Sequence, residues 1–553
     1  MTKVSQMKWW GWGDENQSFD SERRPYFLQY IKETLSISNF EEVKPVEFSS
    51  IEIPASIIHD ELLSKIESIF SKQRVEICDH SRILHAYGKS YRDLFRARKG
   101  EFKTLPDVIV YPKKSHEILA LVDLAKSENI EIIPFGGGSN IVGSVEFLGL
   151  RERVKITVDM KLFNQLIDID KTSMQATFGA GILGPELEKR LDFYSMTLGH
   201  FPDSFQFSTL GGWVATRSAG MQSDRYGKIE DMVIGLKIIT SNGELTIRNL
   251  PRSSNGIDLK HLFIGSEGIF GIITEITVKI HPKPMEKKII GFFFPEFSAG
   301  IEAILSARRQ GLTPSFYRLS DNEKTKMSMA FKEIPGPFQT LKSQAVKKYL
   351  SQIKRFNSDE LCLLLVCFEG DKKSVKEQVI LAKNIFSSFN AFDVGEGASK
   401  SFEQTKYDFP YVRDYVMNYD CVADVSETVC SWSQVQSLYN KVVEEVKNLE
   451  SLWERKILIS CHISHTYHSG ASLYFTWGAQ AKKGDNLELY ESLKSKTEEI
   501  FVSHGGSVSH HHGVGYEHKK WLEEEIGSQG IQILKNFKSS VDLRAIFNSG
   551  KIF

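Results

Sequence analysis

A glycine-rich loop is the clearest candidate for ligand chemistry in this sequence. It follows the apolar run 130–133 and consists of Pro134, Phe135, Gly136, Gly137, Gly138, Ser139 and Asn140. Three consecutive glycines let the backbone turn sharply and lie close to a ligand, and their unobstructed N–H groups can bind phosphate oxygens. The spacing is not the G-x-G-x-x-G dinucleotide fingerprint. Taken alone, the loop is compatible with either a pyrophosphate cradle or a tight turn.

Two further loops rich in glycine, serine and threonine favour the cradle. The first carries Asp203, Ser204, Phe205, Gln206, Phe207, Ser208 and Thr209, followed by Thr216, Arg217, Ser218 and Ala219. The second carries Glu267, Gly268, Ile269, Phe270, Gly271, Ile272 and Ile273. A structural turn needs one such loop, whereas three between apolar segments suit a large cofactor with phosphates, a ribose and a flat ring. We therefore expect these residues to bind a flavin nucleotide.

Three adjacent histidines near the C-terminus, His510, His511 and His512, could carry hydrogen bonding or acid–base chemistry. A metal site is the alternative. Side chains of neighbouring residues on a strand point to opposite faces, however, and would not converge on one ion. We therefore expect the histidines to act in an active site without a metal.

Two arginines and a tyrosine lie in apolar runs that we interpret as strands. An unpaired buried guanidinium is costly, so Arg413 and Arg318 each need a partner. That partner is either a nearby carboxylate, such as Asp414 or Asp321, or a substrate phosphate, which takes a bidentate arginine well. Taken alone, Tyr474 is better explained as a core residue of its apolar strand than as a functional one.

The elements that must position these groups are strands alternating with helices. Strands are expected at 107–112 and 130–133 around a helix that carries Ile118, Leu121, Val122 and Ala125, and at 275–280. Further along, we expect strands at 288–294, 315–319, 361–369, 458–464 and 471–477, and helices at 297–310, 373–387, 433–446, 486–504 and about 519–537. The strands 458–464 and 471–477 are close enough in sequence to pair as a hairpin. This pattern predicts an α+β fold.

Composition shifts divide the chain into four parts. Residues 1–95 form a polar helical segment that begins with an aromatic cluster, Trp9 to Gly13, which we interpret as a packing anchor. Residues 96–285 carry the glycine loops and end at His281-Pro282, a typical boundary. Residues 286–504 form a substrate domain. Residues 505–553 contribute the histidines to the active site and pack on the cofactor domain.

Overall composition excludes several classes of function. Lys and Arg total 69 against 70 for Asp and Glu, so the formal net charge of -1 argues against a nucleic-acid partner. The six cysteines include no C-x-x-C pair, which argues against a thiolate metal site. We expect no transmembrane segment, because no stretch approaches the ~20 apolar residues that one needs.

Taken together, the motifs resemble the alkyldihydroxyacetonephosphate synthase family from residue 7 to about 515. The three loops are specific only to the wider vanillyl-alcohol oxidase flavoprotein superfamily. Narrower matches are Met7-Lys8-Trp9, Gly11-Trp12-Gly13, Gly199-His200, Pro202-Asp203-Ser204, Tyr226–Asp231, Tyr317-Arg318-Leu319, Leu473-Tyr474-Phe475 and Ser509–Gly515. The resemblance implies a two-subdomain FAD-binding domain of the vanillyl-alcohol oxidase type, an α+β substrate (cap) domain and an N-terminal helical segment.

The resemblance also implies an activity. This family replaces the acyl chain of acyl-dihydroxyacetone phosphate with a long-chain fatty alcohol, forming the ether bond of ether lipids through a covalent adduct at flavin N5 without net redox. Its catalytic tyrosine falls on Tyr474, its substrate-binding arginine on Arg413, and a second important arginine on Arg318. A tyrosine base needs cationic or hydrogen-bonding neighbours, which His511, His512 and Arg413 could supply. We expect non-covalent FAD.

Localisation and partners follow from the resemblance alone. It implies a peroxisomal homodimer at a membrane surface, although neither terminus displays a targeting signal. The segment 327–341 is a candidate contact: it carries Met327, Met329, Phe331, Ile334 and Phe338, and two prolines and a glycine deny it a regular helix throughout. It is either a packed loop or a membrane-facing flap.

Two other functions stay open at this point. An FAD-dependent 2-hydroxy-acid dehydrogenase of the glycolate or D-lactate type would keep the fold and also use arginines and histidines near the flavin. A flavin-containing lipid carrier would need no catalysis, but the intact Tyr474 and histidines argue against a decayed site.

Overall fold

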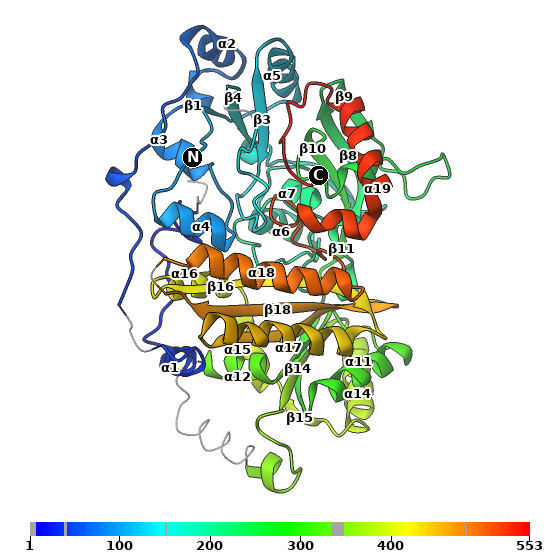
Figure 1. Ribbon diagram of the computed structural model, residues 1–553. Helices are drawn as coiled ribbons and strands as arrows, with labels where there is room; N and C mark the ends of the chain where they lie inside the picture. Colours follow the sequence, from blue (N-terminus) through cyan, green and yellow to red (C-terminus); the bar gives the residue numbers. More distant parts are fainter. Residues whose placement is uncertain (1–6, 38–40, 150–151, 333–347, 483) are drawn as a thin grey trace.

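The computed structural model describes residues 7–37, 41–149, 152–332, 348–482 and 484–553. Figure 1 shows two parts, with the smaller sheets in one and a large sheet in the other. Among the described residues, no helix is long and apolar enough to cross a bilayer. The fold is α+β, as the sequence predicts.

The first sheet carries the glycine loop at its edge. It has the order β1-β2-β4-β3, with β1 at Val75–Glu76, β2 at Val108–Val110, β3 at Ile130–Phe135 and β4 at Val154–Asp159. Strands β2, β4 and β3 are parallel. The helices α5 (Ser115–Ser127) and α2 (Asp60–Phe70) share a buried core with it. Strand β1 thus lies within the segment 1–95, which the sequence suggested to be helical. The remaining helices of that segment are α1 (Pro25–Thr34), α3 (Asp79–Leu84) and α4 (Tyr91–Arg98).

The second sheet is antiparallel and carries the other two loops. Its order is β5-β6-β10-β8-β9, with strands at Leu166–Asp170, Gln175–Gly179, Ile272–Lys279, Val233–Thr240 and Gly243–Ile247. Its core includes residues of α6 (Gly184–Asp192), α7 (Leu210–Thr216) and the C-terminal α19 (Lys519–Val541). The short elements nearby are β7 (Met196–Thr197), β11 (His281–Pro282), α8 (Ser223–Tyr226), α9 (Ile229–Met232) and α10 (Lys260–Phe263). The C-terminal segment therefore returns to this part of the molecule (Figure 1).

The third sheet has the order β15-β12-β14-β13-β17-β18-β16. Its strands are Phe392–Gly395, Glu286–Phe294, Cys362–Gly370, Phe316–Ser320, Ile457–Thr466, Gly470–Gln480 and Cys421–Ser431. Strands β17 and β18 form the expected hairpin. Its core includes residues of α11 (Phe297–Arg309), α14 (Lys372–Ser387), α17 (Val435–Trp453) and α18 (Asn486–Ser503).

Alternation along the strands of the third sheet separates its core from its functional face. In β18, Leu473, Phe475 and Trp477 are buried in the helix-covered core, so the intervening Tyr474 and Thr476 point to the other face. The same alternation turns Arg318 of β13 to that face. A bulge between Ile463 and His465 changes the register of β17 against β18.

Two helices correct the sequence-based expectations. Arg413 lies on α16 (Phe409–Met417), not on a strand, and Pro410 stands in the first turn of that helix, where proline is tolerated. The segment that begins at Met327 continues α12 (Asn322–Ala330). Met327 and Phe331 are buried, so this part is no exposed flap, whereas Ile334 and Phe338 lie outside the described residues. The last short helix is α15 (Gly397–Thr405).

Candidate active site

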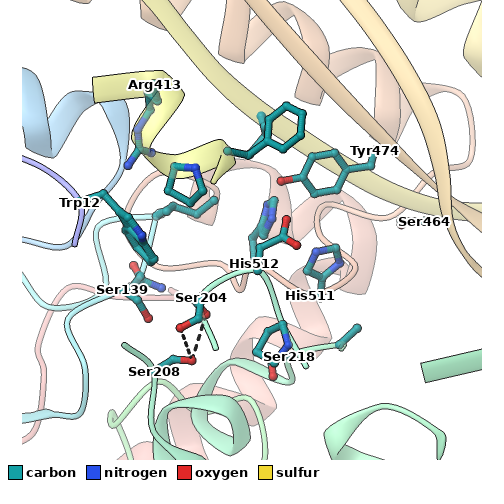
Figure 2. Close-up of a pocket in the computed structure, with 18 of the residues that line it drawn as sticks. Trp12, Ser139, Ser204, Ser208, Ser218, Arg413, Ser464, Tyr474, His511 and His512 are labelled. Atoms are coloured by element: carbon teal, nitrogen blue, oxygen red, sulfur yellow. Dashed lines mark hydrogen bonds between the residues drawn. The ribbon is translucent and has the colours of Figure 1, made fainter. Parts of the chain in front are cut away.

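A cavity of about 450 Å³ lies between the three glycine-rich loops and the functional face of the third sheet. Its lining brings together segments from the N-terminal arm, both smaller sheets, α12, α16, β18 and the histidine block. Figure 2 shows Trp12, Ser139 and Ser204 on one side and Tyr474 on the other, with His511 and His512 between them. Residues more than 400 positions apart thus share one site.

The first glycine loop packs too closely for any side chain. A Cβ at Gly137 would lie 1.6 Å from the Phe207 carbonyl oxygen. Asn140 shapes the turn, because its Oδ1 accepts hydrogen bonds from the backbone N–H groups of Val142 (3.0 Å) and Ser144 (2.9 Å). In the described part of the chain, none of the N–H groups of residues 136–140 donates to a protein acceptor, and Asn140 Nδ2 is buried without a partner. These donors fit the phosphate groups of a nucleotide cofactor.

The second loop leads into a helix that begins at the cavity. Thr209 caps α7 by accepting a hydrogen bond from the Gly212 N–H at 3.2 Å. Ser208 Oγ accepts from Trp213 Nε1 (2.7 Å) and contacts Ser204, as the dashed lines in Figure 2 show. From this block, the cavity is lined by Asp203, Ser204, Ser208, Thr209, Thr216, Ser218 and Ala219. Phe205, Gln206, Phe207 and Arg217 are not part of the lining.

The third loop ties the histidine block to the cofactor side. Glu267 is buried and accepts hydrogen bonds from the N–H groups of Val514 (2.6 Å) and Gly515 (3.0 Å) and from the Ser144 hydroxyl. Gly268, Gly271, Ile272 and Ile273 also line the cavity, whereas Ile269 and Phe270 are core residues. The carboxylate of Glu267 therefore fixes residues 513–515 against the glycine loops.

A second buried carboxylate holds the three histidines. Glu427 of β16 accepts hydrogen bonds from the backbone N–H groups of His510 (2.8 Å), His511 (2.9 Å) and His512 (3.0 Å) and from the Ser509 hydroxyl (2.8 Å). The triplet is a loop, not the strand that the sequence suggested. Consequently the histidines gather around one carboxylate instead of pointing to opposite faces.

Burial controls the ionisation of this cluster. It lowers the pKa of His511 to about 3 and that of His512 to about 4, so both are neutral near pH 7. Burial opposes ionisation of Glu427 too, but the histidines, which become charged in the acid range where Glu427 would titrate, and the backbone N–H groups outweigh it and hold the pKa of Glu427 well below its usual range. The result is a fixed negative charge beneath neutral imidazoles.

The cluster meets the spacing of a metal site but not its donor requirements. Candidate ligand atoms of His465, His510 and His511, and of Glu427, His511 and His512, lie within 4.8 Å of one another. However, the Glu427 oxygens already accept four hydrogen bonds. His510 contacts His511 Nδ1 (2.8 Å) through Nδ1 and the Tyr467 hydroxyl (2.5 Å) through Nε2. We therefore assign no metal to this cluster.

Tyr474 stands over the histidines with its hydroxyl directed into the cavity (Figure 2). Its ring is stacked on His511 at 5.9 Å between centroids and lies edge-on to His512 at 5.5 Å. Burial, and then Asp203 and Glu427, raise the pKa of Tyr474 well above its usual range, while Arg318 opposes them. The neutral histidines thus supply no positive charge to Tyr474, contrary to one option that the sequence left open.

The two arginines lie at different places on the lining. Arg413 projects from α16 near Trp12, and both line the cavity (Figure 2). Its neighbour Asp414 accepts a hydrogen bond from the Trp12 N–H at 2.5 Å, which anchors the N-terminal arm at the cavity. This contact supports the interpretation of the aromatic cluster as a packing anchor.

Arg318 lies on the face of β13 that points into the cavity, near Asp203 and Tyr474. Asp321, which the sequence offered as its partner, instead caps α12 by accepting a hydrogen bond from the Lys324 N–H at 2.7 Å. The guanidinium of Arg318 therefore stays available to a ligand.

The structure thus gathers most of the predicted site residues. The whole first loop, Arg318, Arg413, Tyr474, His511 and His512 line the cavity, while His510 lies behind it against Tyr467. Sequence reasoning missed Lys324, His462, His465 and the buried Glu427. His462 and His465 lie on β17, Glu427 on β16 and Lys324 on α12, and no motif in the sequence links these three elements.

Comparisons with known proteins cover the whole chain. Residues 106–247 match the FAD binding domain family model, and residues 283–552 match the model for the C-terminal domain of FAD linked oxidases. An alkyldihydroxyacetonephosphate synthase from Dictyostelium discoideum is 36% identical over 99% of this chain and 93% of its own length. The enzyme of that name from Trypanosoma brucei brucei is 32% identical over 99% and 92%.

The fold is also similar to that of solved structures. The structure of an alkyldihydroxyacetonephosphate synthase, 34% identical in sequence, superposes with a TM-score of 0.84 and covers 98% of both chains. A p-cresol methylhydroxylase structure, 14% identical with a TM-score of 0.67, shares the fold. The two-part FAD-binding architecture of the vanillyl-alcohol oxidase type is thereby confirmed.

Proposed function

The chain belongs to the alkyldihydroxyacetonephosphate synthase family, and we propose that it exchanges the acyl chain of acyl-dihydroxyacetone phosphate for a long-chain fatty alcohol. The observation that carries the proposal is the cavity itself. It places Tyr474, His511, His512 and Arg413 opposite the loops that match an FAD-binding domain. A single cavity therefore serves both cofactor and substrate.

FAD is the cofactor, and the first loop fits it: residues 136–140 offer free N–H groups, and Gly137 leaves no room for a side chain. When bound, FAD supplies the ring nitrogen that this family uses to displace the acyl chain. We propose that the attachment is non-covalent. Denaturation in acid would then release all of the flavin into the supernatant, whereas flavin that stays with the precipitated protein would contradict it.

The protein groups supply binding and proton transfer. Carbon C1 of the substrate lies next to a ketone, and Tyr474 is the hydroxyl positioned to take its proton once it is ionised. The pKa of Tyr474 is high because of burial, so proton loss requires help from the positive charge of Arg318, while His511 and His512 pack against its ring. Arg413 binds the substrate phosphate as a bidentate partner.

The direct test uses the FAD-loaded protein with palmitoyl-dihydroxyacetone phosphate and hexadecanol. We expect equal amounts of alkyl-dihydroxyacetone phosphate and palmitate, with no consumption of an electron acceptor. Sustained reduction of an acceptor by glycolate or D-lactate, without exchange, would overturn the proposal in favour of a 2-hydroxy-acid dehydrogenase. Flavin binding with neither reaction would favour a lipid carrier.

We further propose a peroxisomal homodimer at a membrane surface, supported by the family resemblance alone. Fluorescence microscopy of the tagged chain, size-exclusion chromatography with light scattering, and liposome flotation test the three parts separately. Because Phe331 is buried, its replacement is no test of membrane contact.

A further inference from the structure

A fully buried lysine faces the cavity beside Arg318 without a carboxylate to pair with. Lys324 is 3% exposed and lines the cavity. Its Nζ donates to Thr476 Oγ1 at 3.0 Å and lies 4.6 Å from the centroid of the Phe409 ring. In the described part of the chain, neither Lys324 nor Arg318 is within ion-pair distance of a carboxylate. Two neighbouring buried cations are costly unless an anion joins them.

The neighbours of Lys324 on its helix indicate which kind of anion could bind there. Lys324, Met327 and Phe331 follow one another at helical spacing, all three are buried, and all three line the cavity. The apolar lining continues into Phe27, Ile31, Leu35, Val416 and Leu458. The ammonium therefore borders an apolar part of the cavity, which suits a ligand with one charged head and a long hydrocarbon tail.

The reacting centre lies next to this head position. Thr476, the hydrogen-bond partner of Lys324, follows Tyr474 by two residues on the same face of β18. Arg318 is close enough to Tyr474 to affect its ionisation. An anion held by Lys324 and Arg318 would therefore lie beside the atom from which Tyr474 takes a proton.

We propose that Lys324 and Arg318 form the binding site for the carboxylate of the fatty acid that leaves during exchange. This inference rests on the proposed function. The flavin ring nitrogen would supply the electron pair for the new bond to C1, and the bond between C1 and the acyl oxygen would break with its electron pair staying on that oxygen. The fatty acid departs as a carboxylate, and the two cations stabilise the charge while the tail stays along α12. Arg413, on a separate part of the lining, keeps the phosphate.

The ionisation of Lys324 makes the site sensitive to pH. Burial, with Arg318 adding to it, lowers the pKa of Lys324 to about 7, and an anion bound there would raise it again. The titratable and charged groups that face Lys324 are Arg318, Asp321, Asp203, Cys461 and His462. Carboxylate binding is therefore expected to weaken as the pH rises above neutrality and Lys324 loses its proton.

Binding of palmitate and of hexadecanol to the FAD-loaded protein, measured by calorimetry, tests the inference. Lys324→Met keeps the length and apolar contacts of the side chain but removes its charge. We expect it to raise the dissociation constant for palmitate about 10- to 100-fold and that for hexadecanol less than about 2-fold. Lys324→Arg keeps the charge and should retain palmitate binding at pH 9, where the wild type weakens. Lys326→Met, on the same helix but paired with Glu323 at 3.0 Å, is the matched control.

Three outcomes would overturn the inference: unchanged palmitate binding in Lys324→Met, equal loss of palmitate and hexadecanol, or equal effects of Lys324→Met and Lys326→Met. A separate measurement distinguishes failure of the proposed function. Arg413→Leu should weaken the binding of dihydroxyacetone phosphate while leaving palmitate binding unchanged. Loss of exchange activity in the wild type would contradict the function without deciding the palmitate result.

Discussion

The two walls of the cavity are built in different ways. The cofactor-side wall consists of loop backbone: the N–H groups of residues 136–140, the capped start of α7 and the loop that begins at Glu267. The cap-side wall consists of side chains that alternate out of a sheet, among them Tyr474 and Arg318. A backbone wall can hold a cofactor but has little proton chemistry of its own, whereas the cap-side wall has titratable groups. Cofactor retention and exchange activity should therefore be separable by mutation.

The largest expected effect comes from adding a side chain to the cofactor-side wall, where the loop backbones pack against each other. In Gly137→Ala the new Cβ would lie 1.6 Å from the Phe207 carbonyl oxygen, a backbone atom that cannot move aside alone. The two loops must separate, so we expect the purified protein to contain no FAD and to have no exchange activity. The ratio of flavin absorbance to protein absorbance measures this.

The matched control is Gly397→Ala, because no atom lies within 4 Å of a Cβ at that position. It should retain a full complement of flavin. If Gly137→Ala also retained full flavin, the backbone wall would not be the cofactor site.

The second-largest effect is expected from a substitution on the cap-side wall, which should lower exchange activity without loss of flavin. Tyr474→Phe removes the hydroxyl that faces the cavity and keeps the ring on His511. We expect a full flavin complement and an exchange rate lower by about 10²–10⁴-fold, the usual cost of losing a general base. Tyr439→Phe is the control, since its hydroxyl contacts Asp321 away from the cavity lining. Near-normal exchange in Tyr474→Phe would reject its role as the base.

The histidine block, residues 509–515, contacts both walls. Substitutions that loosen it from one wall at a time therefore test whether cofactor retention and exchange activity are separable. Glu427 binds residues 509–512 to the cap, and Glu267 binds residues 513–515 to the cofactor loops. Glu427→Gln replaces one acceptor oxygen by an N–H₂ group, so a buried N–H of the loop loses its partner. We expect exchange to fall about 10- to 100-fold with flavin retained.

Glu267→Gln provides the counterpart, because it disturbs the cofactor side and should lower the flavin content as well. We would measure the flavin content, exchange rate and melting temperature of both variants. These values show whether the histidine block serves both walls. If both variants lost flavin equally, the histidine block would belong to the cofactor wall alone.

The backbone wall was predictable from the sequence because its signal is local. Glycine runs such as Gly136–Gly138 are contiguous, and the need for them follows from how closely the backbone approaches its neighbours. The strands that carry Arg318 and Tyr474 were also predictable, since both residues lie in short apolar runs. The sequence therefore predicted which loops and which strands line the cavity.

The cap-side wall was harder to predict because its interactions join distant residues. Glu427 and His510 are 83 positions apart, and nothing near Glu427 indicates that it will accept the N–H groups of a loop. Arg413 was placed on a strand because tyrosine and valine favour β structure, although Pro410 marks a helix start. Lys324 lies in a polar stretch, and only the fold places it against Thr476.

The smallest expected effect is the acid sensitivity of the cap-side wall. Burial lowers the pKa of His511 in the folded protein to about 3, while the unfolded chain keeps a value near 6.5. Between these values the unfolded chain binds more protons, so the free energy of unfolding falls as the pH drops below about 7 and recovers above it. At pH 6 the lowered pKa of this single histidine reduces the free energy of unfolding by about 1 kcal/mol.

In His511→Gln the glutamine cannot titrate. Denaturant unfolding of the FAD-loaded protein should therefore show the wild type losing more stability than this variant between pH 8 and pH 6. His116→Gln, at an exposed position on α5, should lose as much as the wild type. If all three proteins lost stability in parallel, His511 would not be held neutral by burial, and the cap-side wall would lose its clearest example of a buried titratable group.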